Sequence, residues 1–241
     1  MNKKMSRKER QDQKFTRRIM LAGAGATLLA AGGALYYARQ PGGFDVMRSP
    51  DSLDEMIVAS SYDGNVIRLV PDAGQTDILV IGSTSCVFCV DMVENGLEDL
   101  VEFGRMHGLG ITYLPVMTDR NSALSTVLTG CLPNHEMGDP KDFLRLTYDA
   151  AAQRAEGQSG GEIITDIAQR NDLDAEEILE CIDRDTVFMR GRSDGVMSRF
   201  AVEGTPSFVV TSESYEDRFL RFRGFSGTQG MLRQLENARN S

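Results

Sequence analysis

The fold of this protein is decided by the stretch Gly82–Cys89, which reads Gly-Ser-Thr-Ser-Cys-Val-Phe-Cys. Before it lies Ile78–Ile81, an apolar run rich in β-branched side chains, which predicts a buried strand. After it, apolar residues recur at helical spacing over residues 90–101 with acidic residues between them, which predicts an amphipathic helix. Cys86 and Cys89 are therefore expected where a strand ends and a helix begins.

The expected position of Cys86 at the start of this helix has a chemical consequence. The first N–H groups of a helix have no partner inside the helix and form the positive end of its dipole, so they favour a thiolate. The thiolate is the reactive form, and such placements lower the pKa of a cysteine to about 3.5–7.5. Cys89 lies one turn further on, close enough to form a disulfide with Cys86. A Cys-x-x-Cys pair is also half of many zinc sites, so it needs a second signal.

The second signal is the turn Gly204-Thr205-Pro206, which leads directly into the apolar strand expected at Ser207–Val210. A strand, a Cys-x-x-Cys helix and a later Thr-Pro strand together resemble the thioredoxin superfamily. The two signals are about 115 residues apart, which is longer than in thioredoxin itself, and the intervening segment has a helical pattern. This combination resembles the DsbA-like thiol oxidases, which carry a helical insertion inside a thioredoxin fold. The resemblance covers roughly residues 64–238.

The resemblance implies an α/β fold, a thioredoxin fold with a helical insertion subdomain, preceded by an N-terminal signal or anchor segment. The DsbA-like domain is expected over residues 62–241, with the insertion at about 121–199 and a loosely structured linker at 41–61. Pro115 argues that the strand expected at 111–117 lies at an edge or ends early. Gly96 is expected to bend the active-site helix.

The resemblance also implies roles for individual residues. Cys86 would be the nucleophile that forms a mixed disulfide with a substrate, and Cys89 the resolving thiol. Pro206 would follow a cis peptide bond and face the cysteines, and the backbone of Thr205 would offer hydrogen-bonding groups to an extended substrate peptide. No metal and no organic cofactor is implied.

The sequence departs from the pattern of strong oxidases at two places. Their dipeptide between the cysteines contains a histidine that stabilises the thiolate, whereas this chain has Val87-Phe88. Thioredoxin-like enzymes commonly have a buried acid six residues before the first cysteine, whereas this chain has Val80. Both departures indicate a less oxidising pair. His107 and His135, the only histidines, are expected to be ordinary surface residues.

Two further cysteines, Cys131 and Cys181, fall in the expected helical insertion. With the Cys-x-x-Cys motif paired to itself, these two remain, and in an exported protein they would tend to oxidise to a structural disulfide. Closing a loop of about 50 residues would stabilise the fold by roughly 3–4 kcal/mol. The alternatives are two separate buried thiols or a metal site that uses all four cysteines.

The N-terminal residues 1–40 are expected to be an export signal or a membrane anchor. Residues 1–18 are polar and basic, and Ile19–Ala38 contains no charged residue. The stretch Thr16–Leu21, with Arg17 and Arg18, resembles a twin-arginine signal. Twenty uncharged residues are also long enough to cross a bilayer as a helix. The remaining alternative is a buried core helix, and cleavage of the segment stays open.

The charge distribution excludes a class of partners. The whole chain has a formal net charge of −9, but residues 1–40 carry nine basic and two acidic residues, a net charge of +7. The remaining residues therefore carry −16. Such an acidic body is a poor nucleic-acid binder, because phosphate binding needs basic patches.

These observations predict an exported thiol-disulfide oxidoreductase in the periplasm or another extracytoplasmic space. Its partners would be reduced polypeptide substrates and a membrane redox partner, DsbB-like or equivalent. One alternative is a disulfide isomerase or reductase on the same fold. Such isomerases are often dimers with an added dimerisation domain, for which residues 41–61 look too short. Another alternative is a non-enzymatic metal-binding or chaperone domain that uses Cys86 and Cys89 as ligands.

Overall fold

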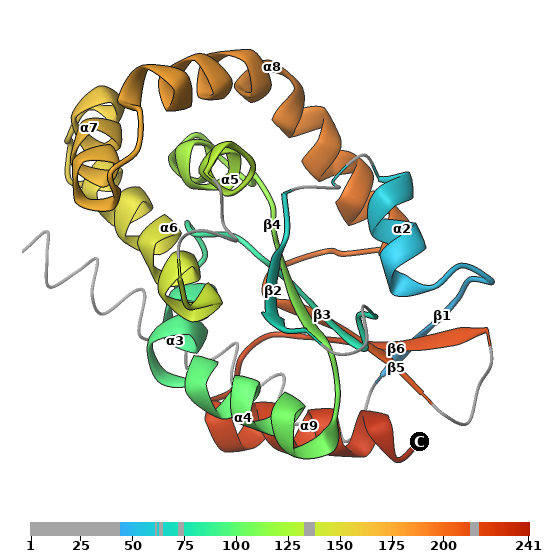
Figure 1. Ribbon diagram of the computed structural model, residues 1–241. Helices are drawn as coiled ribbons and strands as arrows, with labels where there is room; N and C mark the ends of the chain where they lie inside the picture. The colour runs from blue at the N-terminus through green and yellow to red at the C-terminus, as the bar shows by residue number, and fades with distance from the viewer. Residues whose placement is uncertain (1–43, 61, 63–64, 72–74, 133–137, 213–216) are drawn as a thin grey trace, which may run out of the picture. The chain divides into compact units, whose positions relative to one another are not determined.

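The computed structural model describes residues 44–241 except 61, 63–64, 72–74, 133–137 and 213–216 (Figure 1). The described residues belong to one unit of the chain, Gly43–Ser241. The expected export signal or anchor at 1–40 and the residue His135 lie outside the described residues. In the part of the chain that is described, no helix has the length and apolar character needed to cross a membrane.

A six-stranded mixed sheet forms the centre of the described residues, in the order β1-β6-β5-β3-β4-β2. β3 and β4 are parallel, and the other neighbouring pairs are antiparallel. The first four residues of β3 are fully buried, because this strand lies in the middle of the sheet with helices nearby. The strands are β1 (Asp45–Arg48), β2 (Ile67–Val70), β3 (Ile78–Gly82), β4 (Ile111–Pro115), β5 (Ser207–Thr211) and β6 (Arg218–Arg223).

Helices pack around this sheet in two groups (Figure 1). α4 and α9 lie side by side against one part of the sheet, whereas α6, α7 and α8 curve around α5. The second group lies between β4 and β5 in the sequence and is the helical insertion predicted at 121–199. The helices are α2 (Leu53–Ala59), α3 (Val87–Asn95), α4 (Leu97–His107), α5 (Asn121–Cys131), α6 (Pro140–Ala155), α7 (Gly160–Asn171), α8 (Ala175–Arg199) and α9 (Thr228–Arg239).

The expectation of a loose linker at 41–61 is wrong for most of that segment. β1 pairs with β6 in an antiparallel register in which Val46 faces Leu220. α2 begins with a capping box between Ser52 and Glu55 and buries three apolar side chains. A four-residue strand and a seven-residue helix give too short a pattern to recognise in the sequence, because both depend on partners far along the chain.

Pro115 and Gly96 were expected to interrupt a strand and a helix, and the structure shows how each of them does so. β4 ends at Pro115, as expected, but it lies between β3 and β2 and is not an edge strand. Gly96 separates α3 from α4, so the predicted bend is a break between two helices. A Cβ atom on Gly96 would lie 2.9 Å from the ring of Phe225, so a larger residue would displace that ring.

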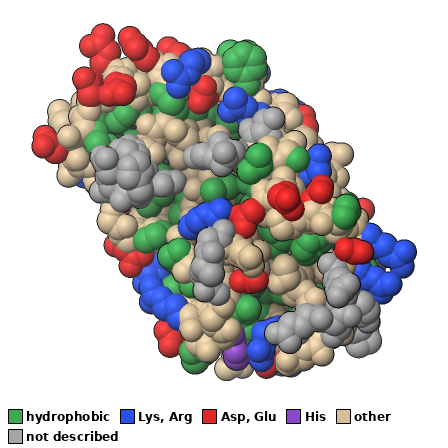
Figure 2. All heavy atoms as spheres, turned by 45° about the vertical axis from the view of Figure 1, so that its right-hand side comes forward, with side chains coloured by type: hydrophobic (Ala, Val, Ile, Leu, Met, Phe, Trp, Pro, Cys, Tyr) green, Lys and Arg blue, Asp and Glu red, His purple; other side chains and the backbone are tan. Residues whose placement is uncertain are grey.

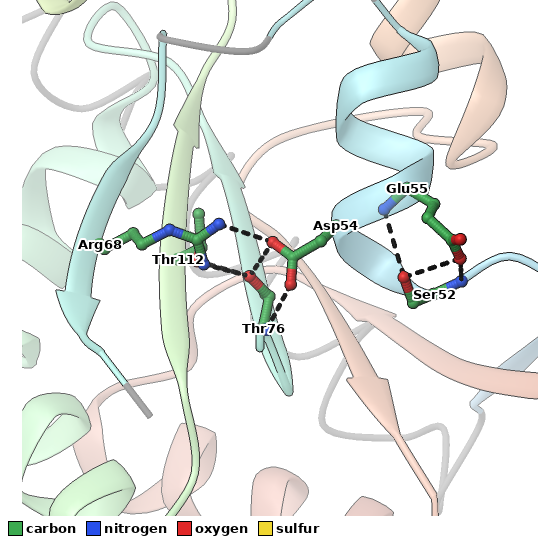
Figure 3. A network of polar contacts seen from close by, with 6 residues as sticks. All are labelled: Ser52, Asp54, Glu55, Arg68, Thr76 and Thr112. Carbon is green, nitrogen blue, oxygen red and sulfur yellow. Dashed lines mark hydrogen bonds and ion pairs between the residues drawn. The ribbon is translucent and has the colours of Figure 1, made fainter. Parts of the chain in front are cut away.

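A polar network fastens α2 to the sheet (Figure 3). The Asp54 carboxylate accepts hydrogen bonds from the Thr76 backbone N–H (2.8 Å), the Thr76 hydroxyl (2.9 Å) and the Arg68 guanidinium (2.8 Å). The hydroxyls of Thr76 and Thr112 lie 2.8 Å apart. Burial alone would raise the pKa of Asp54, but the hydrogen bonds from Arg68 and Thr76 outweigh it and lower that pKa. The network therefore makes residues before β2 an integral part of the domain.

The charged side chains of the described residues fit the acidic composition of the body. On the face drawn in Figure 2, basic side chains are scattered among acidic ones and do not form one continuous patch.

Replacing Asp54 by alanine should lower the free energy of unfolding by about 1–3 kcal/mol, because it leaves the N–H of the buried Thr76 without its acceptor and removes the ion pair with Arg68. Asp51→Ala is the matched control: its carboxylate is half-exposed and lies 3.9 Å from Arg199. That change should stay within about 0.5 kcal/mol of the wild type. Urea unfolding measures both, and equal losses for the two variants would contradict the role given to the network.

Candidate active site

Cys86 occupies the N-cap position of α3, immediately after the loop that leaves β3. Its backbone is extended, with φ −87° and ψ 117°, and its carbonyl accepts from the N–H groups of Cys89 (2.9 Å) and Val90 (3.0 Å). Its own N–H donates to the Ser83 carbonyl at 3.0 Å. Cys86 is half-buried and Cys89 is fully buried, and both are free thiols. The structure thus places both cysteines where the sequence predicts them.

Hydroxyl groups hold the loop before Cys86 against the start of the helical insertion. The Ser83 and Ser85 hydroxyls lie 2.7 and 3.0 Å from the hydroxyl of Thr118. The buried Thr84 and Ser125 hydroxyls lie 2.6 Å apart. These contacts are not apparent from the sequence. The run of small hydroxyl residues before Cys86 was the available signal, but their partners follow β4 and are fixed only by the fold.

The loop before β5 meets Cys86 across 119 residues of sequence. The Thr205-Pro206 peptide bond is cis, as the resemblance implied. The Cys86 thiol donates a hydrogen bond to the Thr205 carbonyl at 3.0 Å. The Pro206 carbonyl accepts a hydrogen bond from the N–H of Gly224, the residue after β6, at 2.7 Å. The end of β6 therefore holds this loop in place. Cys86, Thr205 and Pro206 therefore form one site.

The surroundings of Cys86 favour its thiolate. A hydrogen bond from the Cys89 thiol makes the largest contribution and, with further bonds from the Thr205 side chain and the N–H groups of Cys89 and Phe88, lowers the pKa of Cys86 from an ordinary 9.0 to about 6. Partial burial opposes this change without cancelling it. A thiol with this pKa is mostly ionised at neutral pH and can act as a nucleophile.

Cys89 has the opposite character. Burial raises the pKa of its thiol well above the ordinary value, and the hydrogen bond to Cys86 raises it further. The Ser83 N–H, 3.5 Å from the Cys89 sulfur, acts in the other direction. The Cys86 thiol therefore ionises readily and can act as a nucleophile, whereas the Cys89 thiol keeps its proton. Neighbouring titratable groups whose pKa values are driven apart commonly divide the steps of a reaction between them.

The structure shows the surroundings of the two residues that depart from the oxidase pattern and of His107. The Val87 side chain is 69% exposed beside Cys86, so the dipeptide presents apolar surface and no cation. Val80 is fully buried in β3 and carries no proton. His107, the last residue of α4, packs on Phe103 with ring centroids 4.5 Å apart and the rings tilted by 54°, and it lies 3.6 Å from the Glu236 carboxylate. It therefore has local partners on α4 and α9.

Cys131 and Cys181 are bonded to each other and join α5 to α8 inside the helical insertion, with Cα atoms 5.7 Å apart. This is the pairing that the sequence analysis favoured over separate thiols. Asp185 lies beside the two sulfurs and makes with them a group of potential metal ligands among the described residues. Both sulfurs are committed to the disulfide, and thiolate ligands are what a metal at such a site would need.

Comparison with known proteins identifies the fold. No family model and no curated protein matches the sequence. Among solved structures, BdbD from Bacillus subtilis is similar to this chain at 15% identity and a TM-score of 0.53, and the match covers 82% of this chain and 100% of BdbD. Wolbachia pipientis α-DsbA1 is similar at 13% identity and a TM-score of 0.53, covering 71% of this chain and 90% of α-DsbA1.

A third solved structure matches nearly the whole length of both chains. BcfH of Salmonella enterica Typhimurium is similar at 14% identity and a TM-score of 0.52, with 96% of each chain covered. At these identities the likeness concerns the course of the backbone. The chain therefore has the DsbA-like α/β fold, a thioredoxin fold with a helical insertion.

Proposed function

We propose that this protein is a thiol-disulfide oxidoreductase that introduces or exchanges disulfides in polypeptides through Cys86 and Cys89. The observation that carries the proposal is that the pKa values of the two thiols are shifted in opposite directions. The pKa of Cys86 is lowered to about 6 at the start of α3, whereas burial raises the pKa of Cys89. An inert structural pair has no need of this difference.

Oxidation of a substrate would proceed through two exchanges. A substrate thiolate attacks the Cys86 sulfur of the oxidised pair, the Cys86–Cys89 bond breaks, and Cys89 leaves as a thiolate that then takes a proton. A second substrate thiolate attacks the substrate sulfur of the mixed disulfide, and Cys86 leaves as a thiolate. The substrate loses two electrons and the protein gains them. A lowered pKa makes Cys86 the better leaving group in the second exchange.

Thr205 would position the substrate chain. Its carbonyl lies 3.0 Å from the Cys86 sulfur, so a peptide whose cysteine is bonded to Cys86 passes beside it. Backbone groups at such a loop can pair with an extended peptide and bind it with little regard for its sequence. The exposed Val87 adds an apolar contact next to the reacting sulfur.

The absence of a cation between the cysteines supports a second candidate function, in which the pair isomerises or reduces disulfides. Val87 and Phe88 cannot donate to the Cys86 thiolate through their side chains. A less oxidising pair would suit an isomerase or reductase on this fold. Oxidation of a reduced polypeptide and reshuffling of a scrambled one, assayed side by side, separate the two directions.

We further propose that the body of the protein acts outside the cytoplasm. The basic residues 1–18 and the uncharged stretch Ile19–Ala38 support export or anchoring. The pair would need no metal or organic cofactor. Its electrons would pass to a membrane redox partner, DsbB-like or equivalent, and reduced polypeptides would be its substrates.

Serine substitutions test the roles of the two cysteines. Cys86→Ser should reduce oxidation of a reduced polypeptide to the uncatalysed background, because the nucleophile is lost. Cys89→Ser should instead accumulate mixed disulfides between Cys86 and substrates, since the resolving thiol is missing. Non-reducing electrophoresis and mass spectrometry detect these species. Normal turnover by Cys86→Ser would show that the assignment is wrong.

Lysine substitutions test the export route. Replacing Arg17 and Arg18 together by lysine keeps the positive charge but removes the paired arginines, so export through a twin-arginine route should fall to a small fraction. Cell fractionation and the redox state of Cys86 and Cys89 report the outcome. Retained protein should have both thiols reduced. Unchanged export of the double variant would exclude the twin-arginine interpretation and leave an ordinary signal or anchor.

A further inference from the structure

A pair of buried tyrosines lies behind the active-site loop. Tyr113 of β4 and Tyr148 of α6 have their hydroxyl oxygens 2.7 Å apart, and the two side chains are 1% and 7% exposed. The pair joins the central sheet to the helical insertion. Neither residue was singled out in the sequence, because each is an ordinary core residue of its own element.

The Tyr113 hydroxyl reaches the cysteine loop through Gly82. In the parallel register of β3 and β4, Val80 faces Tyr113, and the tyrosine ring extends past it to Gly82. A Cβ atom on Gly82 would collide with the hydroxyl and lie 2.7 Å from the ring carbon Cζ. The next N–H along the chain, that of Ser83, donates to the Cys89 sulfur at 3.5 Å. The hydroxyl therefore lies against Gly82, and the sulfur accepts from the N–H of the next residue, Ser83.

The titratable groups that act on one another here are few. Cys89 has Cys86 on the same helix, and both Tyr113 and Tyr148 interact electrostatically with the two sulfurs. Tyr62 also acts on Tyr113. Burial raises the pKa of Tyr113 and of Tyr148 well above the ordinary value, so both remain neutral. A neutral hydroxyl does not serve as a base, but it can donate a hydrogen bond.

The resolving step needs such a donor. Before Cys89 can attack, it must lose its proton, and its thiolate then stands in a site with no exposure to solvent. A buried charge is costly unless hydrogen bonds compensate for the lost water. The Ser83 N–H supplies one bond. A hydrogen-bonded hydroxyl pair uses only one of its two hydrogens internally, so the tyrosine pair can supply another.

We propose that Tyr113, held by Tyr148, stabilises the Cys89 thiolate in the resolving step through a hydrogen bond from its hydroxyl. This inference rests on the proposed exchange function of Cys86 and Cys89. In that step the Cys89 thiolate attacks the Cys86 sulfur, the Cys86–Cys89 bond forms, and the bond from Cys86 to the substrate sulfur breaks. The substrate leaves as a thiolate with the electron pair, and the proton of Cys89 has passed to solvent.

The reactions of Cys86 and Cys89 can be measured separately in one experiment with a small aromatic disulfide that releases a coloured thiol. Added in excess to the reduced protein, it first reacts with Cys86 and releases one equivalent of coloured thiol. A second equivalent is released when Cys89 attacks the mixed disulfide. The two remaining cysteines are bonded to each other and stay silent. The first phase therefore reports on Cys86 and the second on Cys89, each as a function of pH.

Tyr113→Phe removes the hydroxyl and keeps the ring. The second phase should become about ten- to a hundredfold slower at neutral pH, the range expected for one hydrogen bond to a charged group. Its pH midpoint should move upward by about one unit or more, while the first phase should change less than about threefold. Tyr62→Phe is the matched control, because Tyr62 is equally buried and its hydroxyl pairs with Ser193 instead. It should leave the second phase and its midpoint unchanged.

Tyr148→Phe provides a second variant that does not depend on how Tyr113→Phe folds. It keeps the Tyr113 hydroxyl but removes its partner, so the second phase should slow and its midpoint should rise by a smaller amount. Wild-type values in both Tyr148→Phe and a folded Tyr113→Phe would overturn the inference, with the proposed function intact. Absence of a second phase in the wild type would overturn both, because Cys86 and Cys89 would then not close a disulfide.

Discussion

The constraint on which the active site depends is the pairing of β3 with β5, which brings the Cys86 sulfur to 3.0 Å from the Thr205 carbonyl. β3 and β5 are antiparallel neighbours in which Ile81 faces Ser207, so the end of one strand meets the start of the other. The helix that follows β3 and the cis Pro206 that precedes β5 are brought together at that point. The buried centre of the sheet therefore fixes the geometry of the site, and a helical insertion can be accommodated between β4 and β5 without disturbing it.

The chemistry follows from how differently the two sulfurs are surrounded. Cys86 receives hydrogen bonds at the start of a helix, where the unpaired N–H groups and the dipole favour negative charge. Cys89 is one turn deeper, and burial there penalises the charged form. Because Val87 and Phe88 have apolar side chains, the Cys86 thiolate is stabilised by the Cys89 thiol, the Thr205 side chain and the backbone N–H groups of Cys89 and Phe88. The lowered pKa of Cys86 thus comes from groups that the fold places around its sulfur and not from the side chains of Val87 and Phe88.

The sequence predicted what short-range patterns determine. Ile78–Ile81, the turn at Cys86 and the apolar helix after it were recognisable because each has a strong local signal. The pairing of Cys131 with Cys181 was favoured over separate thiols or a metal site, and the structure shows the disulfide. The segment 41–61 was misread because β1 and α2 are stabilised by distant partners, such as Leu220 and Thr76. The Tyr113–Tyr148 pair and the hydroxyl contacts of the active-site loop also depend on residues that are neighbours only in three dimensions.

The central claim is that the fold stabilises the thiolate of Cys86. The most direct test is the rate at which a small alkylating reagent modifies Cys86 in the reduced protein, followed by mass spectrometry as a function of pH. Because the thiolate is the reacting form, the rate should rise with a midpoint near pH 6 and level off above it. Cys89→Ala, which removes the largest stabilising hydrogen bond, should move the midpoint upward. A wild-type midpoint near pH 9, that of an ordinary cysteine, would contradict the account.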